Sequence, residues 1–143
     1  IFAILLYIAD KFSVRKKIDT DLNLRAILAI GIFQVLALIP GVSRAGIVIT
    51  AGRLLNFDRY DSAKISFFLS VPAIAGASFL NLKELTHSNI ELNFIVLLAV
   101  IFSFIFSYIT IKYFLIFVKK FSMNTFVVYR IVLGLVLFWF VYT

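Results

Sequence analysis

The stretch that decides the fold is IPGVSRAGIVI, residues 39–49. It is a short polar break that carries one fixed positive charge, set between two strongly apolar runs, residues 22–39 and 45–55. Pro40 removes a backbone donor, and Gly41 permits backbone angles that other residues avoid. We therefore expect the helix that leads into this stretch to end there.

A new helix is predicted directly after the break. Ser43 is a favoured N-cap residue, so the helix should begin at Arg44. The amides of its first turn lack intrahelical partners and point outward at the positive end of the helix dipole. The guanidinium of Arg44 adds forked donors that suit phosphate oxygens. The break therefore predicts an anion cradle, most naturally one for phosphate, at membrane depth.

The composition indicates a polytopic membrane protein rather than a soluble domain. The chain has 143 residues, 63% of them hydrophobic, and a mean hydropathy of +1.08. Its net charge is +7, which in a membrane protein usually reports cytoplasmic loops, so nucleic acid is not an expected partner. There is no cysteine, the only histidine is His87, and acidic residues are few. We therefore expect no disulfide and no metal site made wholly from this chain.

The basic residues gather in three stretches, residues 10–25, 53–64 and 112–120, whereas residues 83–91 carry little positive charge. The positive-inside rule predicts that the three basic stretches lie on the cytoplasmic side and that the fourth lies outside. An alternative for the charged connector at residues 10–21 is a contact with anionic lipid headgroups.

The apolar residues before the connector, residues 1–9, are about half as long as a spanning helix. They open the sequence without an initiator Met, and we interpret them as the end of a truncated helix and the chain as a fragment.

Residues 22–55 are interpreted as a re-entrant helical hairpin. Residues 22–39 can just reach across a membrane, but residues 45–55 cover roughly half of a ~30 Å hydrocarbon core at ~1.5 Å per residue. The hairpin would enter the membrane, break at Pro40 and return to the same side. Irregular backbone at that depth is tolerated only beside protein or a wet cavity, where anion sites of membrane proteins lie. Gln34 either lines this cavity or makes an interhelical hydrogen bond.

Three further apolar runs, residues 62–82, 92–118 and 124–142, are long enough to cross a membrane. The predicted fold is thus an all-α, polytopic integral membrane protein that forms a single transmembrane region. Arg130 lies about two turns into the last run. It is either a functional residue or an arginine that snorkels to the cytoplasmic headgroups.

Small residues follow one helical stripe of the run at residues 62–82. Such a stripe predicts close packing of two helices, and the alternative is a polar wall of the substrate cavity. The stripe consists of Ser62, Ser66, Ser70, Ala73 and Ala77.

Two segments carry a resemblance to a known family. IGIFQVLALIPGVSRAGIVITAGRLLNFDRYDSAKISFFLSVPAIAGA, residues 30–77, resembles the second signature region of bacterial undecaprenyl-diphosphate phosphatases of the BacA or UppP type. FVVYRIVLG, residues 126–134, is similar to the C-terminal helix of that family. The similarity covers nearly the whole chain, in order, and the PG-x-SR element followed by SFFLSVPAIAGA is its specific part.

This resemblance implies a multi-pass enzyme of the bacterial plasma membrane, built from two inverted repeats that each hold a re-entrant hairpin. Such enzymes remove the terminal phosphate of undecaprenyl diphosphate, regenerate the lipid carrier of peptidoglycan synthesis and confer bacitracin resistance. They depend on a divalent cation, Mg or Ca. Their other signature, with its glutamates, serine and histidine, lies in a first repeat that is absent here, so the chain looks like the C-terminal half. The implied partners are the polyprenyl diphosphate substrate, membrane lipids, the missing N-terminal half and a second copy in a homodimer.

Matched by position, Ser43 and Arg44 correspond to the family's Ser-Arg pair, which contacts the diphosphate, and they are the catalytic residues that the resemblance implies. Gly41 and Gly46 correspond to its glycines, which we expect, together with Gln34, to bind substrate.

Two positions depart from the family pattern. Ala45 stands where the family commonly has a second serine, and Val48 stands where it has a threonine. Loss of two hydroxyls is compatible with weaker phosphate binding, an altered substrate or an inactive relative.

The resemblance predicts hydrolysis of undecaprenyl diphosphate. Ser43 has no histidine or carboxylate near it in sequence to act as a base, so we assign it to capping and hydrogen bonding rather than to attack. Acid–base groups and metal ligands are expected in the missing half, and the fragment alone is expected to be inactive. The alternative function is a non-hydrolytic transporter or binding module for a lipid phosphate. A third reading, a purely structural membrane subunit, would require the Pro-Gly-Ser-Arg break to be a mere kink, and a buried arginine without a partner is costly.

Overall fold

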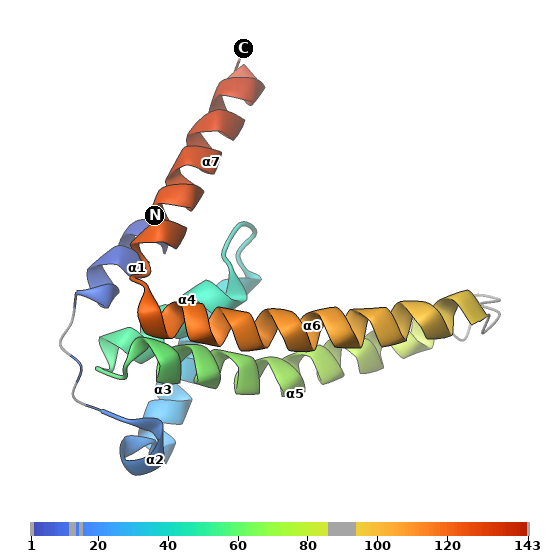
Figure 1. The fold of residues 1–143 in the computed structure, drawn as a ribbon, viewed down its shortest axis with the longest axis horizontal. Helices are drawn as coiled ribbons and strands as arrows, with labels where there is room; N and C mark the ends of the chain where they lie inside the picture. Colours follow the sequence, from blue (N-terminus) through green and yellow to red (C-terminus); the bar gives the residue numbers. More distant parts are fainter. Residues whose placement is uncertain (1, 12–13, 15, 86–93, 143) are drawn as a thin grey trace.

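The computed structural model describes residues 2–11, 14, 16–85 and 94–142, and this part of the chain is built from helices (Figure 1). A short bridge between Lys16 and Phe57 joins the first connector to the turn before α5. In chain order the helices are α1 (Phe2–Asp10), α2 (Ile18–Asp21), α3 (Leu24–Val35), the 3-10 helix η1 (Leu36–Leu38), α4 (Arg44–Leu54), α5 (Arg59–Leu85), α6 (Phe94–Lys120) and α7 (Asn124–Tyr142).

The break predicted at residues 39–43 is confirmed. The chain leaves the helical conformation at Ile39, after η1 has tightened the end of α3. Gly41 then adopts φ +87°, in the left-handed region that a residue without Cβ reaches at low cost. Ser43 is the N-cap of α4, and its Oγ accepts a hydrogen bond from the Gly46 amide at 3.2 Å. Residues 22–55 are therefore two separate helical arms rather than one continuous rod.

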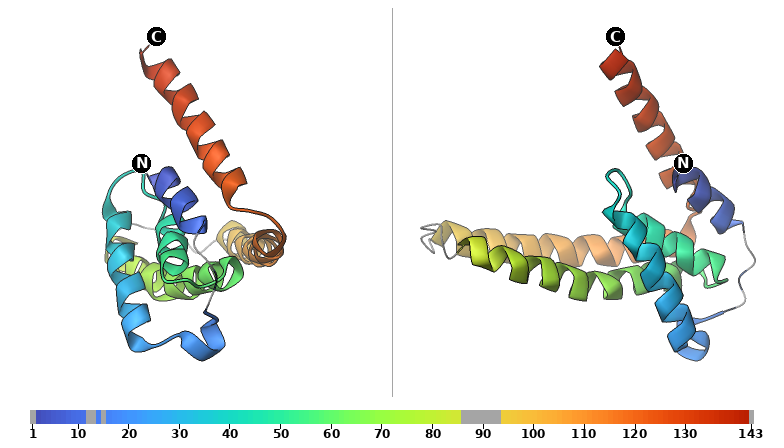
Figure 2. Two further views of the ribbon diagram at one scale, coloured as in Figure 1. Left: turned by 90° about the vertical axis from the view of Figure 1, so that its left-hand side faces the viewer. Right: turned by 180° about the vertical axis from the view of Figure 1, so that it is seen from behind.

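Helix α4 is the centre of the fold. It packs against α1, α3 and α5, and Figure 2 shows it enclosed by them. Its residues from Ile47 to Arg53 are all buried. Ile47 and Val48 pack with Ile30 of α3 in one apolar cluster, while Ile49 packs with residues of α1, α6 and α7 in a second cluster. Burial of apolar surface on several sides holds both ends of α4 in place.

Helices α4 and α5 approach each other closely where Gly52 faces Ser62. A Cβ added to Gly52 would lie 2.7 Å from Ser62 Oγ. Ser62 and Ser66 are both buried, whereas Ala77, further along the same stripe, is exposed. Close packing, predicted for the small-residue stripe, is thus confirmed at its first two positions and does not extend along its whole length.

Three helices of the described chain, α5, α6 and α7, are long and apolar enough to cross a membrane. Helices α5 and α6 lie side by side, and α7 leaves the end of α6 at a steep angle (Figures 1 and 2). Most apolar side chains of α6 and α7 are exposed within this chain, so they must face lipid or other polypeptide. These features support the predicted all-α, polytopic membrane class. Residues 86–93 lie outside the described residues. They include most of the stretch 83–91, which we predicted to lie outside the cell, and the start of the predicted run 92–118.

Candidate phosphate-binding site

A cavity of about 590 Å³ opens beside the N-terminus of α4. Its walls come from α1, from the break before α4 and from α7. Ser43, Tyr129 and Arg130 supply its polar side chains, and the remaining walls are apolar or glycine. The lining residues are Phe2, Ala3, Gly41, Val42, Ser43, Tyr129, Arg130, Leu133, Gly134 and Leu137.

The first turn of α4 presents donors at this cavity. The Gly46 amide donates to Ser43 Oγ at 3.2 Å, and the Ile47 amide donates to the Ser43 carbonyl at 2.9 Å. Within the described chain, the amides of Arg44 and Ala45 have no recorded acceptor. The Ser43 hydroxyl accepts one bond and retains its own proton for donation. Of this turn only Ser43 lines the cavity, so the start of α4 offers an anion there one hydroxyl and the positive end of the helix dipole.

The guanidinium of Arg130 lies over this same turn. A Cβ added to Gly46 would be 3.0 Å from Arg130 Nη1, 3.3 Å from Nη2 and 3.4 Å from Ser43 Cβ. Arg130 is half-buried rather than extended into open solvent. Of the two interpretations that the sequence left open for Arg130, this position favours the functional one. The glycine at position 46 allows the guanidinium to approach the helix start.

Arg44 lies elsewhere. Its Nη1 donates to the Ser70 carbonyl of α5 at 3.3 Å, and Arg44 does not line the cavity. Successive side chains of a helix leave in directions about 100° apart, so Ser43 and Arg44 face different sides of α4. The structure therefore brings Ser43, Gly41 and Gly46 together with Arg130, but not with Arg44. A contact between Arg44 and the diphosphate stays a prediction.

Gln34 is also apart from this cavity. It lies on α3 and is not among the lining residues. Its Oε1 is buried and has no hydrogen-bond partner in the part of the chain that is described. Among the residues that the structure describes, Gln34 neither lines this cavity nor makes a recorded interhelical hydrogen bond, and its role in substrate binding stays a prediction.

The described residues do not fit a divalent cation. Among residues 2–11, 14, 16–85 and 94–142, no group of three His, Cys, Asp or Glu side chains converges. A divalent ion in a protein normally needs several such ligands. His87 lies outside the described residues. The cation implied by the resemblance therefore has no ligand set in this part of the chain.

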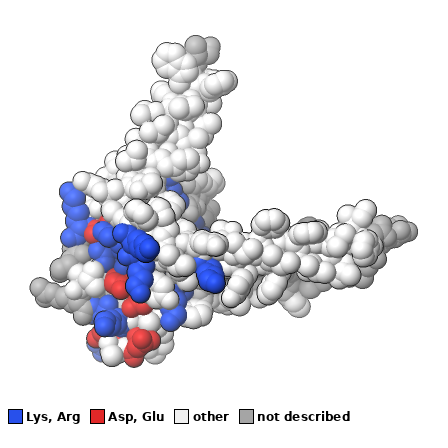
Figure 3. All heavy atoms as spheres, in the orientation of Figure 1, with Lys and Arg blue, Asp and Glu red and all other residues white. Residues whose placement is uncertain are grey.

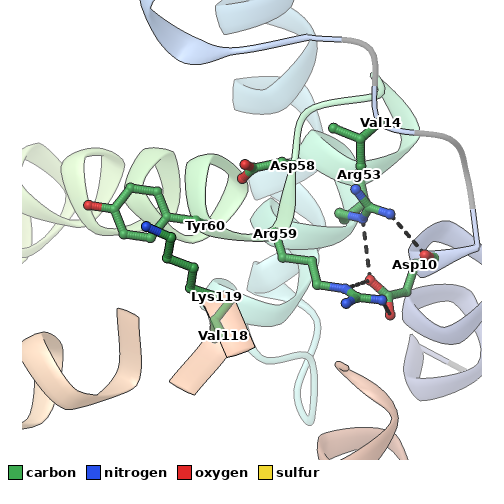
Figure 4. A pocket seen from close by; sticks show the side chains of 8 residues that line it. All are labelled: Asp10, Val14, Arg53, Asp58, Arg59, Tyr60, Val118 and Lys119. Atoms are coloured by element: carbon green, nitrogen blue, oxygen red, sulfur yellow. Dashed lines mark hydrogen bonds and ion pairs between the residues drawn. The ribbon is translucent and has the colours of Figure 1, made fainter. Parts of the chain in front are cut away.

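An ion-pair cluster at the other end of α4 was missed by the sequence analysis (Figure 4). Arg53, whose side chain is 2% exposed, places Nε 3.3 Å from Asp10 Oδ1, and its Nη2 donates to the Asp10 carbonyl at 2.8 Å. Arg59 holds the same carboxylate through two bonds, Nε to Oδ1 at 2.7 Å and Nη2 to Oδ2 at 2.9 Å. Ser122, between α6 and α7, donates to Asp10 Oδ2 at 3.3 Å. One buried carboxylate thus ties α1, α4, α5 and the α6–α7 connection together.

The sequence did contain a signal for this cluster. Arg53 lies near the end of the apolar run 45–55, and Asp10 directly follows the apolar residues 1–9. A cation inside apolar surroundings needs a partner. Asp10, which also borders an apolar run, is an acid that can be this partner.

Together, the long apolar helices and the partly polar cavity at the start of a buried helix define the class of a helical membrane protein with a candidate binding cavity. Residues 1–136 match the family model described as bacitracin resistance protein BacA, and the chain belongs to this family. The resemblance noted from the sequence is thereby confirmed.

The chain is 57% identical to an undecaprenyl-diphosphatase of Pelagibacter ubique over 142 residues, which are 99% of this chain and 56% of that protein. It is 48% identical to an undecaprenyl-diphosphatase of Elusimicrobium minutum, with 96% of this chain and 52% of the relative covered. A third relative, the undecaprenyl-diphosphatase of Alteromonas mediterranea, is 43% identical, with 99% and 54% covered. The chain spans about half the length of the curated relatives it matches.

Proposed function

We propose that this chain is the phosphate-binding half of an enzyme that hydrolyses undecaprenyl diphosphate to undecaprenyl phosphate and inorganic phosphate. The observation that carries the proposal is the meeting of Arg130 with Ser43 over the first turn of α4. A lipid diphosphate has a strongly anionic head and a long apolar tail. The cavity offers donors for the head and apolar walls, including Phe2, Leu133 and Leu137, for the first part of the tail.

The position of the site in the membrane is also part of the proposal. With 11 residues, α4 spans about 16 Å, roughly half of the hydrocarbon core. We propose that α3 and α4 form a re-entrant hairpin, with the break at residues 39–43 at membrane depth. Irregular backbone is tolerated there when protein or a wet cavity surrounds it. The packing of α4 against α1, α3 and α5 and the cavity beside the break support this placement.

Phosphoryl transfer is catalysed largely by positioning and by stabilisation of negative charge. In this proposal the guanidinium of Arg130, in the wall of the cavity, holds the phosphoryl oxygens at the positive end of α4. The Ser43 hydroxyl donates to one of them while its oxygen still caps α4. Arg44 adds a second cation if its bond to the Ser70 carbonyl, 3.3 Å long, is exchanged for one to substrate. Acid–base groups and the divalent cation are assigned to the part of the enzyme outside this chain, and we expect the chain alone to be inactive.

The two departures from the family pattern do not alter the wall of the cavity. Val48 is buried in the apolar cluster of α3, α4 and α5, and neither Val48 nor Ala45 lines the cavity. The missing hydroxyls therefore leave Ser43 and Arg130 of the site in place, as both a hydrolytic enzyme and the alternative, a non-hydrolytic transporter or binding module for a lipid phosphate, require.

Release of inorganic phosphate from undecaprenyl diphosphate by the purified full-length protein tests the proposal. We expect release by the wild type and a loss of roughly 10²-fold in kcat/KM for Arg130→Gln, because one charge-stabilising contact is removed. Arg130→Lys should recover only part of the rate, since lysine lacks the forked donors. Lys112→Gln removes an exposed charge of α6 away from the cavity and is the matched control. Binding of the lipid without phosphate release would support the non-hydrolytic alternative instead.

A further inference from the structure

One face of α7 continues the phosphate cavity away from its polar end. Arg130, Leu133, Gly134 and Leu137 all line the cavity, and their spacing of three and four residues places them on one side of the helix. At ~1.5 Å per residue, this stripe runs for roughly 10 Å beyond Arg130. The cavity therefore has a polar end, where Ser43 and Arg130 lie, and an apolar extension along α7.

The extension lies in an uncharged part of the molecule. Residues 131–141 of α7 include no Lys, Arg, Asp or Glu, and Figure 3 shows the visible face of this arm without charged side chains. Leu133 and Leu137 are both exposed within the described chain. Inside a bilayer, an apolar surface gains little from the exclusion of water, so packing selects what covers it. The shape of the groove therefore decides which apolar chain it holds.

Helix α1 forms the opposite side of this groove. Leu6 of α1 and Val127 of α7 belong to one apolar cluster, and Figures 1 and 2 show the two helices side by side at the start of α7, which then extends beyond α1. Phe2 and Ala3 of α1 line the cavity together with the stripe of α7. The groove is thus bounded by two helices that are fixed to each other at one end.

Gly134 leaves open space in the wall of the groove. A Cβ added at this position would meet nothing within 4 Å, in contrast to Gly46 and Gly52, where neighbouring side chains lie close. Glycine is unfavourable inside a helix, and no close neighbour in the described chain requires it at position 134. Its effect on the cavity is to leave room between the side chains of Leu133 and Leu137.

We propose that this groove holds the first isoprene units of the polyprenyl tail and that Gly134 is a specificity-determining residue for that tail. The inference rests on the proposed function, because the tail must leave the site where Arg130 and Ser43 hold the diphosphate. The stripe of α7 is an apolar wall that begins one turn from Arg130. A prenyl chain carries a methyl branch on each unit, and the space at Gly134 accommodates such a branch.

Two diphosphates test the groove in the purified full-length protein: undecaprenyl diphosphate and isopentenyl diphosphate, which has a single isoprene unit. The measured quantity is the ratio of kcat/KM for the long substrate to kcat/KM for the short one. We expect Gly134→Leu to lower this ratio by about tenfold, mainly through a higher KM for the long substrate, because the new side chain fills the groove beside the tail. Gly134→Ala should have an intermediate effect.

Gly76→Leu in α5 is the matched control. Gly76 is also an exposed helical glycine where a Cβ would meet nothing within 4 Å, and it lies outside the cavity, so we expect the wild-type ratio. Thermal unfolding of both leucine variants without added lipid checks that they fold. Leu137→Ala removes an apolar contact without filling the groove and should lower the ratio by about threefold, which gives a second test if Gly134→Leu does not fold.

Binding of undecaprenyl phosphate, which carries the same tail, gives a readout that needs no turnover. We expect Gly134→Leu to weaken its apparent affinity by about tenfold. If the wild type releases no phosphate from either diphosphate, the proposed hydrolysis is wrong, and the binding measurements alone then decide the assignment of the groove. An equal loss of kcat/KM on both substrates, or an unchanged affinity for undecaprenyl phosphate in a folded Gly134→Leu variant, would overturn the role of Gly134 while leaving the hydrolysis in place.

Discussion

The guanidinium of Arg130 on α7 lies against Gly46 in the first turn of α4, with Nη1 3.0 Å from the place that a Cβ would occupy. These residues are far apart in sequence, and α7 otherwise extends away from α4 (Figure 1). A long cationic side chain therefore reaches from the last helix to the start of the central one. There it adds a full charge to the partial charge of the helix dipole.

Gly46→Ala tests whether this close approach matters. The new methyl group would push the guanidinium of Arg130 aside by a few tenths of an ångström, and we expect kcat/KM for undecaprenyl diphosphate in the full-length protein to fall by about tenfold. Stability should not fall, because alanine is the better helix former by about 1 kcal/mol. Gly31→Ala in α3, where a Cβ would meet nothing within 4 Å, is the control. An unchanged kcat/KM for Gly46→Ala would show that the contact is incidental.

Arg44→Ala separates two roles for the arginine that the sequence singled out. If Arg44 binds substrate as proposed, phosphate release should fall by roughly 10²-fold or more, with normal expression and little change in Tm. If Arg44 only holds the Ser70 carbonyl of α5, the Tm should fall while turnover stays near normal. Phosphate release and thermal unfolding, measured on the same preparation, distinguish the two results.

Asp10→Asn should destabilise the protein strongly. The substitution removes the carboxylate that lies 3.3 Å from Nε of Arg53, a side chain that is 2% exposed, and so takes away negative charge that offsets a buried cation. Breaking such a pair by removal of one partner costs about 3–5 kcal/mol. Asp19→Asn changes an exposed aspartate of α2 and should alter stability by less than about 0.5 kcal/mol. Thermal unfolding of the two full-length variants in detergent measures the difference, and equal midpoints would contradict this account of the cluster.

Local chemistry made part of this structure predictable. Pro40 and Gly41 end one helix and Ser43 starts the next, because these effects act within a few residues. The runs that became α5, α6 and α7 are recognisable from length and hydropathy alone. The pairing of Asp10 with Arg53 and of Arg130 with Gly46 was not predictable in the same way. Each joins residues from distant helices, and only the packing of α1 and α7 around α4 brings them together.

The site illustrates the same limit. Arg44 was favoured as the cation of the site because it follows Ser43 directly, but neighbours on a helix point to different sides. The guanidinium at the cavity comes instead from Arg130, on α7, the last helix in the sequence. Spacing along the chain identified where an anion would bind, but it did not identify all the side chains that reach it.

Gly52→Ala tests how closely α4 and α5 must pack. A Cβ at this position would lie 2.7 Å from Ser62 Oγ, 2.9 Å from Ser62 Cβ and 3.2 Å from Ser62 Cα. The last of these atoms is backbone, so relief requires the two helices to separate rather than a side chain to rotate. Overpacking of this kind costs about 1–3 kcal/mol, which should exceed the gain of about 1 kcal/mol in helix propensity.

The control for this substitution is Gly76→Ala in α5, where a Cβ would meet nothing within 4 Å and where we expect the thermal midpoint to stay constant or rise. The double variant Gly52→Ala/Ser62→Gly removes the opposing Cβ and hydroxyl and should recover part of the lost stability, because it restores room at the crossing. Unfolding midpoints of the three full-length variants provide the measurement. If Gly52→Ala and Gly76→Ala shift the midpoint equally, the crossing of α4 and α5 is not set by the Gly52–Ser62 contact.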